Sequence, residues 1–66
     1  MKEILLNGEP HTVSAATVSA LVDELGLAAP TVLIEHNGLA LRRSEWSNAL
    51  LNASDRIEIL RVSAGG

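Results

Sequence analysis

Residues 56–66 read Arg-Ile-Glu-Ile-Leu-Arg-Val-Ser-Ala-Gly-Gly, and the rest of the chain can be understood from them. The run 56–62 begins by alternating charged and apolar side chains, which is the period-two signature of a half-buried β-strand. Gly65 and Gly66 lack a Cβ, so they make the thinnest end that a polypeptide can have. Four residues beyond Val62 extend at most roughly 13–14 Å. The pattern predicts a folded domain at 1–62 and a flexible Gly-Gly tail at 63–66 that presents a carboxylate to another protein's active site.

The glycine pair has simpler explanations as well. Two terminal glycines also arise by chance, or as a linker or cloning remnant. The remaining sequence has to decide between these alternatives.

Composition bounds the class of protein. Sixty-six residues make one domain, and a chain this small buries only about 60% of its unfolded surface. Apolar residues make up 47% of the chain, Trp46 is its only large aromatic residue, and it has no cysteine. The core must therefore consist of aliphatic side chains without disulfides, which suits a reducing cytoplasm.

Charge argues against nucleic acid as a partner, and hydropathy argues against a membrane. The net charge is −3 and only five residues are basic, whereas nucleic-acid binding depends on neutralising phosphates. No apolar run reaches the length of a membrane span, and the N-terminus lacks a signal-peptide pattern. We expect a cytoplasmic protein with a protein partner, and neither nucleic acid nor membrane as a target.

The first half of the chain predicts a hairpin and a helix. Asn7-Gly8 is the strongest short hairpin signal, joining strands at 2–6 and about 9–13, and Pro10 favours an edge position for the second strand. Apolar residues then recur at helical spacing, with Thr17 as a plausible N-cap and Gly26 as a C-cap. The helix is expected at about 18–25, with Leu27 packing just beyond it.

The second half predicts three more strands. They are expected at 31–36, 39–41 and 56–62, the first two joined by Asn37-Gly38. Residues 42–51 show partial helical spacing, consistent with a single turn. The order β-β-α-β-β-β predicts an α+β fold, a mixed four- to five-stranded sheet covered by one α-helix. The last strand should lie parallel beside the first, because both are strongly apolar.

Catalytic and metal-binding patterns are missing from the sequence. His11 and His36 lie in different strands without a partner at metal-ligand spacing, so both are interpreted as ordinary surface or strand-end histidines. The serines lack a base-and-orienter set, and the acidic residues read as solvated surface. Arg42-Arg43 is interpreted as a solvated turn and Trp46 as part of the core. We expect no self-contained catalysis and no bound metal.

Leu60 and Val62 are candidates for partner contact. Alternation with Ile57 and Ile59 places them on the sheet face away from the helix. An exposed Leu-Val pair before the tail is either the beginning of a docking patch or a filler on a small protein.

The chain resembles the thiamine-biosynthesis sulfur carriers, the ThiS family, which have the ubiquitin-like β-grasp fold. The resemblance runs essentially end to end. It rests on the Thr17-Val18 helix entry, Asn37-Gly38 followed by Leu41, Arg43-Ser44-Glu45-Trp46, Asp55-Arg56-Ile57 and the ending Val62-Ser63-Ala64-Gly65-Gly66. Two positions depart from it: Arg42, where relatives often carry proline, and Ser63, which is commonly apolar.

The resemblance implies a carrier cycle rather than an enzyme. An E1-like adenylyltransferase (ThiF type) would use ATP and Mg²⁺ to adenylate the Gly66 carboxylate, while this chain binds no cofactor itself. Sulfur from a cysteine-desulfurase persulfide would give a Gly66 thiocarboxylate, which thiazole synthase (ThiG type) consumes. Ala64 and Gly65 would thread the partner's channel, and Leu60 and Val62 would dock on its surface.

Three alternatives stay open. The same tail occurs in the small subunit of molybdopterin synthase and in protein modifiers of the ubiquitin kind. A modifier that builds chains needs lysines, and this chain has only Lys2. A non-reactive β-grasp binding module with incidental glycines is the third.

Overall fold

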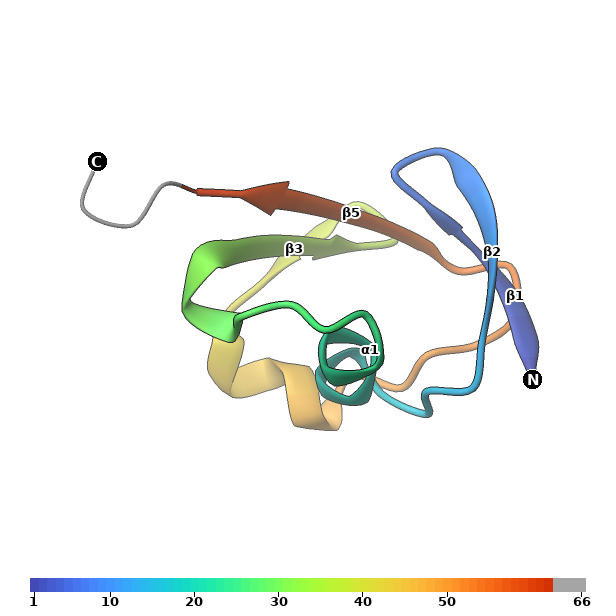
Figure 1. Ribbon diagram of the computed structural model, residues 1–66, viewed down its shortest axis with the longest axis horizontal. Helices are drawn as coiled ribbons and strands as arrows, with labels where there is room; N and C mark the ends of the chain where they lie inside the picture. The colour runs from blue at the N-terminus through green and yellow to red at the C-terminus, as the bar shows by residue number, and fades with distance from the viewer. Residues whose placement is uncertain (63–66) are drawn as a thin grey trace.

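A computed structural model describes residues 1–62, which form one five-stranded sheet with a helical layer on one face (Figure 1). The strands are β1 (Lys2–Leu6), β2 (Glu9–Val13), β3 (Val32–His36), β4 (Leu39–Leu41) and β5 (Arg56–Arg61). The helix α1 spans Val18–Glu24, and two 3₁₀ segments, η1 and η2, span Ala29–Thr31 and Arg43–Asn48. No helix within the described part of the chain is long and apolar enough to cross a membrane.

The sheet is mixed, as predicted, and its strand order is β2-β1-β5-β3-β4. β1 and β5 run parallel at its centre, and the other neighbours are antiparallel. The strand that contains Pro10 lies at the edge, where a missing backbone donor costs no ladder bond. This is the β-grasp arrangement that the sequence resemblance implied.

Both Asn-Gly turns form as predicted, because each places two residues in the left-handed region that a type I′ turn requires. Asn7 and Gly8 have φ of 50° and 83°, and Asn37 and Gly38 have φ of 51° and 85°. Asn7 does more than turn the chain. Its side-chain amide accepts from the backbone N–H of Ile59 at 2.7 Å and donates to the same residue's carbonyl at 3.2 Å. It thus extends the junction of β1 and β5 beyond the end of β1.

The helix begins as predicted and ends slightly earlier. The Thr17 hydroxyl accepts a hydrogen bond from the Ala20 N–H at 3.1 Å, which caps the first turn. Leu25 is the C-cap, so the helix stops one residue before the predicted end, and Gly26 follows with φ of +70°.

Three other boundaries differ from the predictions by a residue or more. β3 starts at Val32 rather than residue 31, because Thr31 closes the η1 turn onto the Ala28 carbonyl. β5 ends at Arg61 rather than Val62. The single turn expected within 42–51 is a six-residue 3₁₀ segment.

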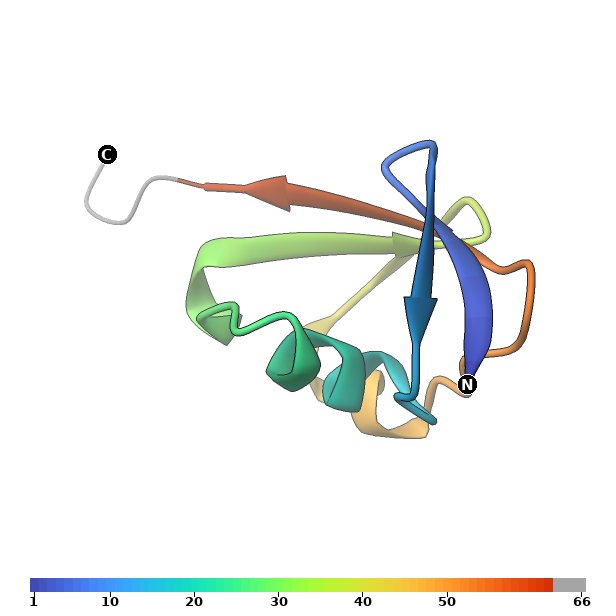
Figure 2. The same ribbon diagram turned by 45° about the vertical axis from the view of Figure 1, so that its right-hand side comes forward.

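The core lies between the sheet and the helical layer formed by α1 and η2 (Figure 2). Ile57 from β5 and Val18 and Leu21 from α1 are completely buried, and Leu27 packs against this cluster from just beyond the helix. Trp46 is buried, so its interpretation as a core residue is confirmed. The helical layer lies on one side only, so no helix or strand within residues 1–62 covers the opposite face of the sheet.

Candidate functional site

The uncovered face of the sheet carries an exposed leucine pair near the C-terminal end of β5. Leu60 pairs with Leu33 across the β3–β5 ladder, and their exposed fractions are 63% and 56%. Ile34 and Ile57 are buried. They lie an odd number of residues from Leu33 and Leu60 on the same strands, so they face the other side of the sheet. The prediction that Leu60 points away from the helix is therefore confirmed, since successive strand residues face opposite sides.

Sequence reasoning missed Leu33. The signal was available: Val32 and Ile34 occupy the core face of β3, so an apolar residue between them has to face outward. Its pairing with Leu60 joins two side chains that are 27 positions apart, and only the strand register reveals the pair.

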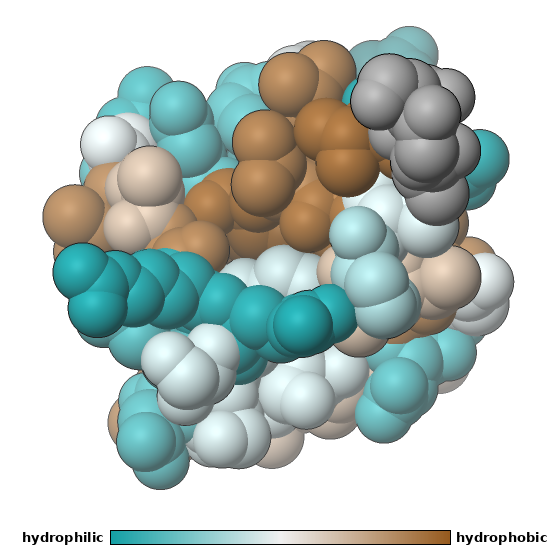
Figure 3. All heavy atoms as spheres, turned by 90° about the vertical axis from the view of Figure 1, so that its left-hand side faces the viewer, coloured by the Kyte–Doolittle hydropathy of each residue, from teal (hydrophilic) through white to brown (hydrophobic). Residues whose placement is uncertain are grey.

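A shallow groove of about 550 Å³ runs over this face. Its lining includes Leu33, Leu60, Ala40, Asn7 and the carboxylate-bearing Glu35 and Glu58. Figure 3 views the molecule from the C-terminal end of β5, and hydrophobic surface gathers in its upper part, at the height of β3 and β5 in Figure 1. We call the part of the groove lined by Leu33, Glu35, Glu58 and Leu60 the open-face patch.

The chain remains attached to the sheet up to the last described residue. The Val62 N–H donates to the Thr31 carbonyl at 2.8 Å, one residue beyond β5, and the Val62 side chain is 39% exposed. This bond holds the last described residue against the residue that precedes β3. Val62 is therefore exposed as predicted, next to the open-face patch.

The residues predicted to react and to thread a channel lie outside the described residues. These are Gly66, Gly65 and Ala64, together with the predicted tail at 63–66. Their assigned roles stay predictions.

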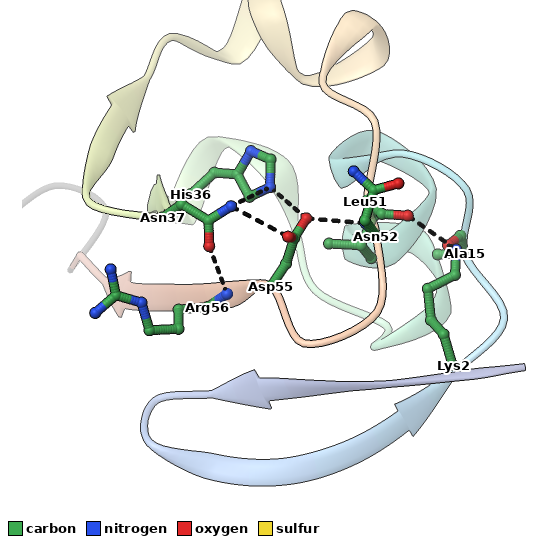
Figure 4. A network of polar contacts seen from close by, with 8 residues as sticks. All are labelled: Lys2, Ala15, His36, Asn37, Leu51, Asn52, Asp55 and Arg56. Atoms are coloured by element: carbon green, nitrogen blue, oxygen red, sulfur yellow. Dashed lines mark hydrogen bonds and ion pairs between the residues drawn. The ribbon is translucent and has the colours of Figure 1, made fainter.

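A polar cluster lies at the other end of β5 (Figure 4). His36 Nε2 donates to Asp55 Oδ2 at 2.7 Å, and the other carboxylate oxygen accepts from Asn37 Nδ2 at 3.1 Å. The Asn52 N–H also donates to Asp55, and the Asn37 side-chain oxygen accepts from the Arg56 N–H. The carboxylate thus ties the β3–β4 turn to the loop that leads into β5.

One of the two interpretations that covered this cluster was wrong. His36 ends β3, as a strand-end histidine should, but Asp55 does not belong to a solvated acidic surface, because it is paired with His36. Their exposed side-chain fractions are only 17% and 12%. They lie 19 positions apart, so no local spacing pointed to the pair.

Asp55 has a perturbed pKa. Burial acts to raise the pKa of this carboxyl. Hydrogen bonds from the Asn52 backbone, His36 and Asn37, with the charge of His36, outweigh burial and hold it below the ordinary value. Donors that favour the ionised form stabilise a structural carboxylate here.

The cluster lies far from Val62, the last described residue. It precedes β5, whose six residues at about 3.3 Å each separate it from Val62 by roughly 20 Å. Among residues 1–62, no three histidine or acidic side chains gather closely enough to hold a metal ion. The geometry therefore makes the cluster a brace for the sheet, while the open-face patch and the end of β5 form the candidate site.

Comparison with known proteins identifies the family. The ThiS family model matches residues 4–66, so the chain belongs to the ThiS family.

Solved structures place the fold in the same family. The crystal structure of a thiamine biosynthesis protein (ThiS) from Geobacter metallireducens is 32% identical, with a TM-score of 0.80 over 97% of this chain and 99% of that one. A solution structure of a thiamine biosynthesis protein from that organism gives a TM-score of 0.79, also at 32% identity, over 97% of this chain and 87% of that one.

One curated relative is much longer. A thiazole synthase from Paramagnetospirillum magneticum is 34% identical over 65 residues. The match covers 97% of this chain, which spans only 20% of that relative's length.

Proposed function

We propose that this chain is a sulfur carrier protein for thiazole formation in thiamine biosynthesis, with Gly66 carrying the sulfur as a thiocarboxylate. The observation that carries the proposal is the family match over residues 4–66, which includes the Gly-Gly pair. The bond between Val62 and Thr31 supports it, because it holds the residue directly before the proposed tail against the sheet.

The carboxylate needs activation before it can accept sulfur. A terminal carboxyl with a pKa of about 3.5 is ionised at neutral pH and is a poor electrophile. In the proposed step, a Gly66 carboxylate oxygen attacks the α-phosphorus of ATP and pyrophosphate leaves, giving an acyl-adenylate. An E1-like enzyme of the ThiF type supplies the ATP and Mg²⁺ site, so this chain serves as its substrate and binds no cofactor of its own.

Sulfur then replaces the adenylate. A persulfide derived from a cysteine desulfurase attacks the acyl carbon, AMP leaves, and a thiol reduces the resulting acyl disulfide to the thiocarboxylate. The carrier contributes orientation, since a positioned acyl carbon reacts far faster than a free one. Ala64 and Gly65 supply a segment thin enough to enter the enzyme's active site.

The proposed acceptor is a thiazole synthase of the ThiG type. A protein named thiazole synthase contains a region similar to nearly the whole of this chain. This supports a functional link between a sulfur carrier of this kind and thiazole synthesis. Leu60 and Val62, both exposed beside the tail, are proposed to dock on the partner enzymes.

Chain-building modification is disfavoured by the only lysine. Lys2 Nζ donates to the carbonyls of Ala15 at 2.6 Å and Leu51 at 3.1 Å, and it is half-buried. An amine that is held in this way is a poor acceptor for a second copy of the tail.

Intact mass spectrometry tests the proposal. The chain is incubated with the E1-like enzyme of its own organism, a cysteine desulfurase, cysteine, ATP and Mg²⁺. We expect a mass gain equal to the replacement of one oxygen by one sulfur, located by fragmentation to Gly66. An unchanged mass with an enzyme that demonstrably adenylates another carrier would refute the sulfur-carrier function.

A further inference from the structure

The open-face patch contains an electrostatic conflict within the described residues. Glu35 pairs directly with Glu58 across β3 and β5, one step along the same face from the Leu33–Leu60 pair. Both side chains are exposed. Directly opposed residues have Cβ atoms about 4.5–5.5 Å apart, and like charges in that arrangement destabilise a sheet.

No basic group in residues 1–62 resolves this conflict. Arg56 lies on the same face two residues before Glu58, but the described residues contain no ion pair within 4.0 Å other than His36–Asp55. The remaining four residues, Ser63 to Gly66, contain no basic side chain. Within residues 1–62, the two neighbouring carboxylates therefore have no ion-pair partner within 4.0 Å.

We propose that Glu35 and Glu58 together receive an arginine of the E1-like activating enzyme, next to an apolar side chain of that enzyme seated between Leu33 and Leu60. The inference deepens the proposed function and rests on it for the identity of the enzyme. A guanidinium presents several donors in a plane, which matches two adjacent carboxylates better than a lysine ammonium does. The groove can hold both the arginine and the apolar side chain, since it is lined by Leu33, Leu60, Glu35 and Glu58.

The position of the patch fits an enzyme that must also reach the tail. Val62 lies two residues beyond Leu60 and is the last described residue. An enzyme that covers this face can therefore engage the groove and the residues after Val62 together. A cation bound here is attracted by both carboxylates and also offsets the repulsion between them. The pair therefore binds a cation more favourably than a single carboxylate would.

The test replaces both carboxylates by amides of the same shape. In Glu35→Gln/Glu58→Gln, we expect the midpoint of urea unfolding to rise by roughly 0.5 M, because the repulsion is gone. We expect affinity for the activating enzyme, measured by calorimetry, to fall at least about tenfold and to depend less on salt. The matched control is Glu9→Gln/Asp23→Asn, which changes net charge equally at an edge strand and the helix; it should bind like the parent chain.

A second variant excludes misfolding as the cause. Glu58→Arg places a guanidinium opposite Glu35, so the fold should gain stability while the enzyme's arginine is repelled and binding falls further. Unchanged affinity in both variants, or an equal loss in the control, would overturn the proposal. Sulfur loading of the parent chain with unchanged variant affinity would leave the proposed function standing without this contact. If binding depended on the two glutamates but the parent chain accepted no sulfur, the contact would stand and the proposed function would fail.

Discussion

Single residues decide how firmly the two ends of β5 are held. At its start, the Asp55 carboxylate accepts hydrogen bonds from three residues that belong to different segments. Beyond its end, the Val62 N–H donates to the Thr31 carbonyl and holds the last described residue against the sheet. Within residues 1–62, side chains brace the start of the strand and a backbone bond holds its end.

Substitution of Asp55 tests the brace. Asp55→Asn keeps one acceptor oxygen but loses the charge, so we expect the free energy of unfolding at neutral pH to fall by about 1–2 kcal/mol. Urea unfolding followed by circular dichroism measures it. Asn52→Ala is a suitable control, since it retains the backbone N–H that donates to Asp55 and should change stability little.

The same brace predicts a pH dependence. The pKa of Asp55 lies below its ordinary value of 3.8 in the folded chain, so the unfolded chain takes up the proton first as pH falls. The contribution of Asp55 is therefore complete above about pH 3.8 and is lost as pH falls through the lower folded pKa. The difference in stability between the parent chain and Asp55→Asn should shrink in that window; a constant difference would contradict the assignment.

Glycine at position 65 is expected to matter for transfer alone. Gly65→Val adds a branched side chain where the proposed function requires a thin segment, so we expect sulfur loading to slow roughly a hundredfold. The urea midpoint should stay unchanged. Rates come from intact mass over time, and Ser63→Ala is the control that should load like the parent chain.

At the scale of elements, α1 is short for the task of covering a sheet. It has seven residues, and isolated helices of this length are unstable in water without packing and caps. Its N-terminal cap therefore contributes directly to the stability of the domain.

Thr17 provides a test of that cap. Thr17→Ala removes the acceptor for the Ala20 N–H, and we expect the free energy of unfolding to fall by about 1 kcal/mol. Thr17→Ser keeps the hydroxyl and should recover most of the loss. If the alanine and serine variants were equally stable in urea, the hydroxyl would have no capping role.

β5 allows a direct comparison, because Ile57 on one face lies in the core and Leu60 on the other face is exposed. Leu60→Ala removes an exposed side chain, so stability should change by no more than about 0.5 kcal/mol, while sulfur loading at limiting enzyme should slow. Ile57→Ala opens a cavity in the core and should cost about 2–5 kcal/mol. That is most of what a domain of this size has available. A Leu60 variant that loads normally would remove this residue from the docking surface.

At the scale of the whole molecule, the division between domain and tail remains a prediction. A chain that ends at Val62 keeps the complete sheet, the helix and the Thr31 bond. We expect it to unfold at the same urea concentration as the full chain and to accept no sulfur. A large drop in stability on truncation would show that residues 63–66 belong to the folded domain.

The elements were predictable because their signals are local. Asn7-Gly8 and Asn37-Gly38 require left-handed backbone whatever surrounds them, and the Thr17 cap acts within one helical turn. Boundaries such as the start of β3 were missed by a residue, because Thr31 could join a strand or close a turn equally well. The bond from its N–H to Ala28 decides the matter.

The candidate site was only partly predictable. The exposure of Leu60 and Val62 followed from alternation along one strand. The outward position of Leu33 could have been read in the same way, but its pairing with Leu60 required knowledge of which strand lies beside β5 and in which register. The pairing of Glu35 with Glu58 required the same knowledge. The pairing of His36 with Asp55 had the same requirement.

The sequence by itself determined the α+β class, the parallel pairing of the first and last strands, both turns, the family and the Gly-Gly ending. These depend on periodicity and on backbone angles, which act over a few residues. Tertiary structure alone decided which side chains share the open face, that Asp55 is a brace and not a surface charge, and that two carboxylates stand opposite each other. Those relations arise when strands far apart in the chain become neighbours, and the energy of a charge depends on its neighbours in space.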